Sequence, residues 1–445
     1  MSFPRHANYR DSGEVWLGDV PSHWEMKRLR FVADVNPSKS EVAGLSADTD
    51  VSFLPMEAIG DDGSLDLERV RTLGEMQAGY TYFREGDVTI AKITPCFENG
   101  KGAIMRELRN EVGFGTTELI VARPKPSQTS SAYLHWLFTS RPFRKAGEAF
   151  MYGAGGQKRV PDDFVRDFKI AFPPKGEQIV IANFLCRETA KIDALIEEQK
   201  RLIELLREKR QAVISQAVTK GLDPNVPMKD SGVEWLGEVP AHWEVKAIKR
   251  LSPVLRGASP RPIDDPKYFD DDGEYAWVRI ADASASDGVL KETTQRLSTF
   301  GSALSVKLQP GSLFVSIAGT VGKPCIAGIK CCIHDGFVYF PRLRIDPMFL
   351  FRLFESGACY AGLGKMGTQL NLNTDTIGSI RVGLPPPEEL SAIIVFIDSE
   401  TKRFDQFIAE ANSAMLLLIE RRSAIISAAV TGKIKVPDTT KEEHP

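Results

Sequence analysis

The sequence DSGEVWLGDVPSHWEMK, which spans Asp11 to Lys27, returns as DSGVEWLGEVPAHWEVK between Asp230 and Lys246. The two copies share 12 of 17 residues at an offset of 219 positions. A second pair follows: REKRQAVISQAVT begins at Arg207 and IERRSAIISAAVT at Ile419, with 8 of 13 residues shared at an offset of 212. Such self-similarity indicates two copies of one structural unit. We therefore predict a chain of two halves that share a fold.

Between these anchors the similarity is weaker, but the order of features is kept. Gly86-Asp-Val-Thr-Ile-Ala91 corresponds to Gly311-Ser-Leu-Phe-Val-Ser316, and each half then reaches a proline pair, at 173–174 or 385–386. The offset between matching residues rises from 219 to 225 and then falls to 212, which loops of different length within one fold explain. Short β-rich runs alternate with Gly, Asp and Pro, which is typical of strands and loops. We predict an α+β fold with a mixed or antiparallel sheet.

Two long segments after the proline pairs are predicted to be helical. Ranges 177–220 and 388–431 each have 44 residues, with no proline and no glycine. A continuous helix of that length spans about 66 Å, and the alternative is a break near Leu185–Glu188. Apart from one apolar stripe, the surface of each predicted helix is charged. This pattern favours pairing of the two helices with each other, and the alternative is that each helix lies separately on its own domain.

Apolar residues recur along both segments at alternating steps of three and four, which indicates an antiparallel two-helix coiled-coil seam. The predicted seam residues are Ile192, Leu195, Leu202, Leu206, Val213, Phe404, Phe407, Ala411, Ala414, Leu418 and Ile425. A flanking stripe adds Ile196, Ile203, Ile408 and Met415.

These features predict seven segments along the chain. In order they are a first repeat anchor, a first α+β domain, a central helical spacer, a second anchor, a second α+β domain, a C-terminal helical spacer and a tail. Their ranges are 1–27, 28–174, 175–221, 222–246, 247–386, 387–432 and 433–445.

Composition sets limits on the class of protein. The chain has 445 residues and a net charge of −3, so any nucleic-acid surface must be local. The six cysteines form no CxxC pair and no His-x-x-x-His is present, which argues against a disulfide framework or a metal site. No apolar run reaches about 18 residues and no signal peptide is recognisable, so we expect a cytoplasmic protein.

A search for catalytic motifs finds none that is complete. Gly319-Thr-Val-Gly-Lys323 is followed by Pro324 instead of Ser or Thr, so it is not a phosphate-binding loop. No GxGxxG follows a strand, and no Asn/Asp-Pro-Pro-aromatic tetrapeptide is present. Asp162, Asp167 and Lys169 loosely match a nuclease signature, which leaves a stand-alone nuclease as an alternative. We predict no catalytic residues.

The repeated His and Trp residues of the anchors have two interpretations. They could stack on bases, or they could pack at the start of each unit. The surrounding Gly and Pro are those that a turn requires, so we predict that His23, Trp24, His242 and Trp243 are structural.

Basic and amide side chains cluster beside glycines in both halves. Arg, Gln and Asn can bond to base edges, and Lys can meet phosphates. Because such clusters recur in both copies, we predict that they contact DNA. The residues are Arg84, Lys92, Lys101, Gln157, Lys158, Arg159, Arg279, Lys323, Lys365, Gln369, Asn371 and Asn373.

Taken in order, these motifs resemble one known family. The anchor DSGVEWLGEVPAHWEVK, the strand Gly-Asp-Val-Thr-Ile-Ala, the Gly-Gly-Gln and Gly-Thr-Gln stretches and the closing AVISQAVT are similar to the specificity subunits of type I restriction–modification systems. The resemblance covers essentially the whole chain. It implies two target-recognition domains that each read one half of a split, double-stranded DNA sequence, separated by long antiparallel helices.

The resemblance also implies partners. Two methyltransferase subunits are expected to dock on the helices, and restriction subunits are expected to join them. The chain itself is expected to need no cofactor, with S-adenosylmethionine, Mg²⁺ and ATP used by the partner subunits. Because the two halves differ, the implied target is asymmetric. A coiled-coil adaptor without a DNA role is the remaining alternative.

Overall fold

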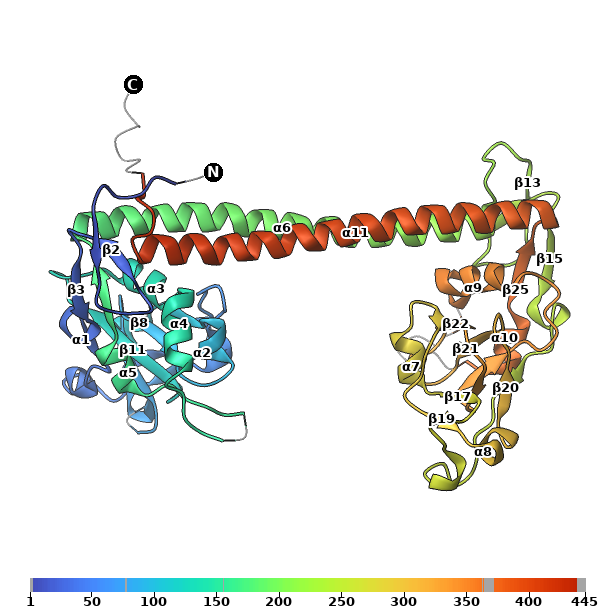
Figure 1. Ribbon diagram of the computed structural model, residues 1–445, viewed down its shortest axis with the longest axis horizontal. Coiled ribbons are helices and arrows are strands. Elements are labelled where there is room, and N and C mark those ends of the chain that lie inside the picture. Colours follow the sequence, from blue (N-terminus) through green and yellow to red (C-terminus); the bar gives the residue numbers. More distant parts are fainter. Residues whose placement is uncertain (1–2, 77, 155, 362, 364–371, 438–445) are drawn as a thin grey trace. The chain divides into compact units, whose positions relative to one another are not determined.

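The computed structural model describes residues 3–76, 78–154, 156–361, 363 and 372–437. The chain divides into two compact units. Unit 1 contains residues 1–200 and 413–445, and unit 2 contains residues 201–412. Each unit therefore combines one sheet-rich domain with part of both long helices (Figure 1).

The described part of unit 1 contains two four-stranded sheets and two strand pairs. One sheet has the order β6-β5-β10-β7, in which β10 is parallel to β5 and antiparallel to β7. The other has the order β4-β11-β8-β9 and is antiparallel throughout. The strands are β1 Tyr9–Asp11, β2 Asp19–Pro21, β3 Glu25–Arg28, β4 Ala33–Val35, β5 Asp50–Leu54, β6 Val70–Thr72, β7 Thr81–Arg84, β8 Val88–Ala91, β9 Gly102–Ile104, β10 Val112–Gly115, β11 Leu119–Pro124 and β12 Lys169–Phe172.

Short helices cover the sheets of unit 1. The Ser130 side chain caps the first turn of α3 by accepting a bond from the Tyr133 backbone N–H, and α3 buries Tyr133, Leu134 and Leu137. Side chains at this spacing share one face of a helix, which here faces the core. The helices are α1 Leu29–Val32, α2 Cys96–Asn99, α3 Ser131–Thr139, α4 Arg141–Glu148 and α5 Asp162–Asp167.

Unit 2 repeats this topology. Its sheet β19-β17-β23-β20 again has one parallel pair, β17 with β23, and its sheet β16-β24-β21-β22-β18 differs by one added strand, β18. The strands are β13 Met228–Asp230, β14 Glu238–Pro240, β15 Glu244–Ala247, β16 Leu255–Arg256, β17 Tyr275–Val278, β18 Val289–Leu290, β19 Arg296–Leu297, β20 Val306–Leu308, β21 Leu313–Ser316, β22 Pro324–Ala327, β23 Cys331–Ile333, β24 Phe337–Tyr339 and β25 Arg381–Leu384. The helices are α7 Ile280–Ala285, α8 Thr299–Ala303, α9 Pro347–Ser356 and α10 Thr374–Ser379. The predicted α+β fold with a mixed sheet is confirmed.

The two long helices are continuous. Helix α6 spans Lys175–Lys220 and α11 spans Pro387–Val430, so the alternative of a break near residues 185–188 is wrong. Inside unit 1 the first half of α6 pairs with the last half of α11, and Arg422 Nε lies 2.8 Å from Asp193 Oδ1. Inside unit 2 the other halves pair, with Arg210 Nε 3.0 Å from Asp405 Oδ1. The repeat offset of 212 converts one ion pair into the other, so both units have the same antiparallel register.

The structure corrects the frame of the predicted seam. Ile192, Ile196 and Ile203 are buried on α6, whereas Leu195 and Leu202 are 44% and 43% exposed. On α11 Ala411 and Ile425 are buried, and Phe407 is 40% exposed. The remaining predicted residues are half-buried: Leu206, Val213, Phe404, Ala414 and Leu418.

The error has a physical cause. Each helix carries two adjacent apolar stripes, and periodicity alone does not distinguish the one that packs from the one left exposed. From Ile192 the buried stripe takes a step of four and then three, not three and then four.

The core of each unit includes the C-terminal end of a long helix. In unit 1 Ile426 and Val430 of α11 pack in one cluster with Trp24, and in unit 2 Ile214 and Val218 of α6 pack in one cluster with Trp243. Both tryptophans are fully buried. Among the described residues, no helix is long and apolar enough to cross a membrane.

Candidate nucleic-acid interface

Several predicted DNA-contacting residues of unit 1 converge at the end of strand β8. The Lys92 backbone N–H donates to the Glu118 carbonyl at 2.8 Å, and the Val160 N–H donates to the Lys92 carbonyl at 2.9 Å. The Thr94 N–H donates to the Lys158 carbonyl at 2.9 Å. Backbone bonds therefore hold the loop that follows β8 against the loop before α5, and the side chains of Gln157 and Lys158 are exposed there.

Arg159 holds this loop in place. Its guanidinium bonds to both carboxylate oxygens of Glu118, with Nη2 2.7 Å from Oε1 and Nε 2.9 Å from Oε2. These bonds lower the pKa of Glu118. Since the fork of Arg159 is engaged with a carboxylate, Arg159 positions the loop, and its exposed neighbours are the side chains free to meet DNA.

Lys101 joins this group through the backbone, because its carbonyl accepts the Ala91 N–H at 2.9 Å. Arg84 does not join it. The Arg84 N–H bonds to Asp87, which precedes β8, whereas Lys92 follows β8, so the two lie at opposite ends of that strand. Arg84 therefore lies apart from the loops that meet after β8, and its predicted DNA contact stays a prediction.

In unit 2 Lys323 is the structural counterpart of Lys101, since its carbonyl accepts the Ser316 N–H from strand β21 at 3.0 Å. The Lys323 ammonium donates to the carbonyls of Ser284 and Ser286 at 2.6 and 3.0 Å. It thereby fixes the end of helix α7 to the loop that follows β21. The Lys323 ammonium is half-buried and has two carbonyl partners. This arrangement indicates a structural role for Lys323 and not a contact with phosphate.

Arg279 lies at the start of α7 beside a cavity of about 660 Å³. The floor of this cavity contains Trp277 and His334, whose ring centroids are 6.0 Å apart. Burial lowers the pKa of His334, and its Nδ1 accepts the Gly336 backbone N–H at 2.8 Å, so the proton of the neutral imidazole lies on Nε2 and that N–H is the group left to donate. The other lining residues are Ile263, Asp264, Pro266, Phe269 and Gln295.

Sequence reasoning missed His334 and Gln295, which stand outside the glycine-rich stretches that guided the prediction. The only signal was position: each lies next to a short strand, His334 after β23 and Gln295 before β19. Together with Arg279 they supply an aromatic, an amide and a guanidinium group in one depression.

The remaining predicted residues of unit 2 have different outcomes. The Asn373 side chain caps α10, with Oδ1 accepting the Thr376 N–H at 2.8 Å, so its role here is structural. Lys365, Gln369 and Asn371 lie outside the described residues.

The residues of the nuclease alternative do not form a site. Asp162 accepts a bond from Asn36 at 2.7 Å, Asp167 pairs with Arg28 and Arg30, and Lys169 bonds to Glu14 at 2.9 Å. Each side chain has its own partner. The two carboxylates therefore do not form a metal site with the lysine beside it, as a nuclease would require.

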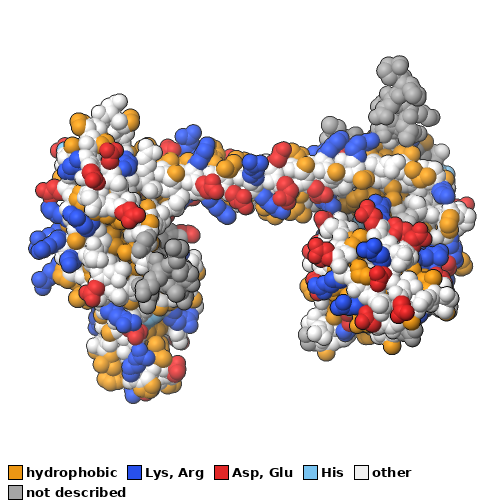
Figure 2. Space-filling view, turned by 180° about the vertical axis from the view of Figure 1, so that it is seen from behind, with side chains coloured by type: hydrophobic (Ala, Val, Ile, Leu, Met, Phe, Trp, Pro, Cys, Tyr) orange, Lys and Arg blue, Asp and Glu red, His pale blue; other side chains and the backbone are white. Residues whose placement is uncertain are grey.

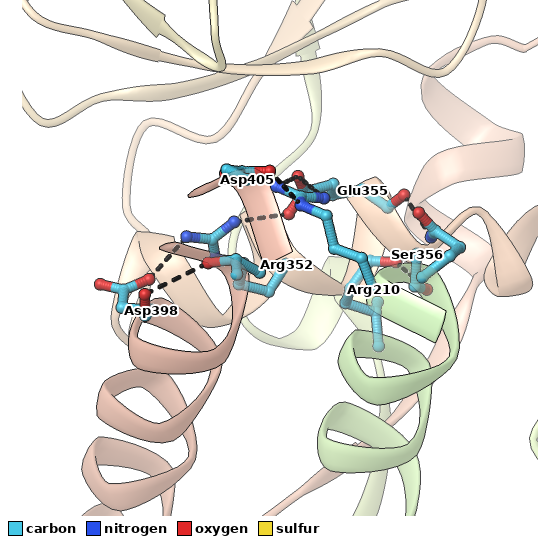
Figure 3. A network of polar contacts seen from close by, with 9 residues as sticks. Arg210, Arg352, Glu355, Ser356, Asp398 and Asp405 are labelled. Carbon is cyan, nitrogen blue, oxygen red and sulfur yellow. Dashed lines mark hydrogen bonds and ion pairs between the residues drawn. The ribbon is translucent and has the colours of Figure 1, made fainter. Parts of the chain in front are cut away.

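The sheet domain of unit 2 is fixed to both helix segments of its own unit (Figure 3). Arg352 of α9 bonds to Asp398 of α11 at 2.6 Å and to Glu355 at 2.7 Å. Glu355 also accepts from Arg210 of α6 at 3.2 Å. Burial opposes the charge of Arg352, but its bonds to the two carboxylates raise its pKa above the ordinary value. An ionic network therefore spans three helices.

The outer surface of the paired helices alternates apolar and charged side chains (Figure 2). Leucines contribute much of the apolar part, and Leu195 and Leu202 lie outside the buried stripe of α6. The exposed apolar residues on α6 and α11 are Ile179, Leu195, Leu202, Leu205, Val395, Phe396, Phe407, Leu416, Leu417 and Ile419.

Comparisons with known proteins agree with this geometry. A family model described as type I restriction modification DNA specificity domain matches residues 21–205. The Escherichia coli type I restriction enzyme EcoEI specificity subunit is 28% identical over 93% of this chain and 83% of its own length. The E. coli EcoAI specificity subunit is 44% identical over a shorter stretch, 36% of this chain and 27% of its own length.

Two solved structures share the fold. The HsdS subunit from Thermoanaerobacter tengcongensis superposes with a TM-score of 0.59 at 17% identity, covering 93% of this chain and 98% of that one. A chain from work on complex assembly and conformational transition of the type I R-M system superposes with a TM-score of 0.70 at 20% identity, covering 92% and 98%.

Proposed function

This chain is a type I restriction–modification specificity subunit, and on that premise we propose that its two units read different halves of one interrupted DNA sequence. The observation that carries the proposal is the repeated topology with unlike loops. The sheets of unit 1 and unit 2 have the same strand order apart from β18, yet the surfaces beside them differ. Two units with the same fold and different surface side chains would recognise two different half-sites, as an asymmetric, split target requires.

In unit 1 the reading surface is the pair of loops joined at the end of β8. Exposed Gln157 can bond to an adenine edge, and exposed Lys158 can neutralise a phosphate. In unit 2 the reading surface is the cavity beside Arg279. The Arg279 guanidinium, which is 44% exposed and contacts Thr294 and Asp282 in the free chain, exchanges these contacts for a guanine edge in this proposal. The Gln295 amide and the His334 Nε2–H add further hydrogen-bonding groups.

The helices supply the spacing and the docking surface for partners in this proposal. α6 and α11 are the helices that run from one unit into the other, so their length sets the gap between the two half-sites. Their exposed leucines offer apolar area to methyltransferase subunits, and restriction subunits join that assembly. S-adenosylmethionine, Mg²⁺ and ATP belong to those partners. The chain itself contributes recognition and no catalytic centre.

Salt dependence of DNA binding tests this function against the adaptor alternative. The full chain, with its methyltransferase subunits, is titrated into a fluorescent duplex between 50 and 200 mM salt. A protein with six to ten phosphate contacts loses roughly 10³–10⁵ in affinity over that range. We expect a steep loss, and a flat response would contradict a DNA-reading role.

A further inference from the structure

Three potential metal ligands meet in unit 1, outside the reading surface. The His23 Nε2 lies 2.8 Å from Glu177 Oε2, and the His6 Nε2 lies 3.8 Å from Glu177 Oε1. The ligand atoms of all three residues lie within 4.8 Å of one another. Glu177 is held from its other side by the Trp24 indole N–H, which donates to Oε1 at 3.2 Å.

His6 is the unusual member of this cluster. Its side chain is only 7% exposed, and its Nε2 has no hydrogen-bond partner. A buried ring nitrogen without a hydrogen-bond partner is a position that an ion can fill.

Metal-binding histidines present the lone pair of one ring nitrogen to the ion. Such residues donate the second ring N–H to a carbonyl or carboxylate, which fixes the tautomer and the orientation of the ring. In His6 the buried Nε2, which has no hydrogen-bond partner, is the nitrogen available to a metal ion.

Unit 2 contains the equivalent of His23, Trp24 and Glu177 but has no counterpart of His6. His242 Nε2 lies 2.7 Å from Glu389, and the Trp243 indole N–H donates to Glu389 at 3.1 Å. These contacts copy those of His23, Trp24 and Glu177, so they account for the link between anchor and helix. The offset of 219 places Asn225 at the position of His6, and Asn225 is exposed. The link therefore does not require His6.

We propose that His6, His23 and Glu177 form a site for a divalent transition-metal ion of the zinc class. Two imidazoles and one carboxylate, with water as the fourth ligand, are a donor set that Zn²⁺ accepts. Bonds of about 2.0–2.1 Å in a tetrahedral site separate ligand atoms by about 3.4 Å. The His23–Glu177 pair, at 2.8 Å, therefore has to open, and the pairs that His6 makes have to close. As the metal takes the place of the proton that His23 Nε2 shares with Glu177, the imidazole changes tautomer and carries its proton on Nδ1.

The location gives the metal a structural purpose. In unit 2 the chain passes without a break from α6 through residues 221–227 into β13. At the equivalent junction of unit 1 two separate segments meet, and the contacts between them are non-covalent. The Lys435 N–H donates to the Pro4 carbonyl at 2.7 Å, and the Tyr9 hydroxyl donates to the Gly432 carbonyl at 2.9 Å. A metal bound by His6 and Glu177 ties the N-terminal segment to α6 at this junction.

Metal titration of the full chain tests the proposal. The protein is stripped with a chelator and titrated with Zn²⁺ by calorimetry and with Co²⁺ by visible absorption. We expect one equivalent per chain, tighter binding at higher pH because protons compete with the metal for the imidazole nitrogens, and the d–d spectrum of four-coordinate Co²⁺. A metal ion that binds only the folded state also raises the midpoint of thermal unfolding.

Matched variants assign the binding to these residues. His6→Asn, which copies unit 2, should weaken Zn²⁺ binding at least about 100-fold, since even outer partners of a ligand cost about 10–100-fold. His242→Asn, in the unit without a third ligand, should leave the affinity unchanged, and His6→Cys should restore most of it. Circular dichroism checks that each variant is folded. Absence of one-equivalent binding in the wild type, or equal affinity in His6→Asn, would overturn the site.

Discussion

The links between anchor and helix differ from the reading surfaces in how much they vary between the two units. His23 and Trp24 bond to Glu177 in unit 1, and His242 and Trp243 bond to Glu389 in unit 2, with distances that agree within 0.1 Å. The loops after β8 and β21 share only their backbone bonds. The chain thus keeps one scaffold twice while it varies the side chains that the scaffold presents. If scaffold and surface are separable in this way, a change in the scaffold affects both units alike, and a change in one reading surface affects one half-site.

Removal of a matched pair of heptads should have the largest effect. Deletion of Gln199–Leu205 together with Glu410–Leu416 keeps the antiparallel register of α6 and α11, because these segments face each other in it. It shortens the helices by about 10 Å, or roughly three base pairs of DNA. Sequencing of modified DNA should show both half-sites retained with a shorter gap. The original target still being methylated would contradict a spacing role for the helices.

The anchor tryptophans should stabilise both units about equally. Each is fully buried against the end of a long helix, and loss of a buried Trp costs about 3–5 kcal/mol. Trp24→Ala and Trp243→Ala should each lower the unfolding free energy of the affected unit by that amount. Hydrogen exchange, measured as the protein is denatured, reports the unfolding free energy of each unit separately. If one variant costs far less than the other, the scaffold is not equally used in both halves.

Side chains on the reading surfaces should act on one half-site each. Arg279→Ala should relax base choice in the half read by unit 2, with a loss of about 1–3 kcal/mol for the preferred base. Gln157→Ala should do the same for the half read by unit 1. Lys158→Ala is the matched control, and we expect it to weaken binding to all sequences and to reduce the salt slope by about one. Uniform weakening by Arg279→Ala would make it a backbone contact.

The cross-helix ion pairs should matter least. Arg422 and Asp193 in unit 1 are 31% and 47% exposed, and Arg210 and Asp405 in unit 2 are 22% and 59% exposed. Partly solvated pairs contribute about 0.2–1 kcal/mol. Arg422→Ala should therefore lower stability only slightly. Arg210→Ala should lower stability more, because it also leaves Glu355 with one partner fewer. Urea denaturation at low and high salt measures the stability of both variants.

Much of the scaffold could be predicted from sequence because duplication repeats it. The anchors, the long helices and the α+β class all follow from patterns that occur twice. The seam frame could not be predicted reliably, since Leu195 and Leu202 form an apolar stripe as regular as that of Ile196 and Ile203. Only the three-dimensional contacts decide which stripe is covered.

The reading surfaces were less predictable, because a basic residue beside a glycine has two different roles. Lys158 is exposed, whereas Lys323 donates to two carbonyls and Arg159 is engaged with Glu118. The sequence does not show which cation finds an internal partner. His334 and Gln295 were missed for the opposite reason, since no local pattern connects residues that the sheet brings together.

The most direct test of the account is a map of methylated bases in DNA modified by the wild-type chain with its methyltransferase subunits. Two unlike readers on one scaffold predict a target of two different short sequences separated by a gap of fixed length and unspecified sequence. A continuous target, or two identical half-sites, would contradict it.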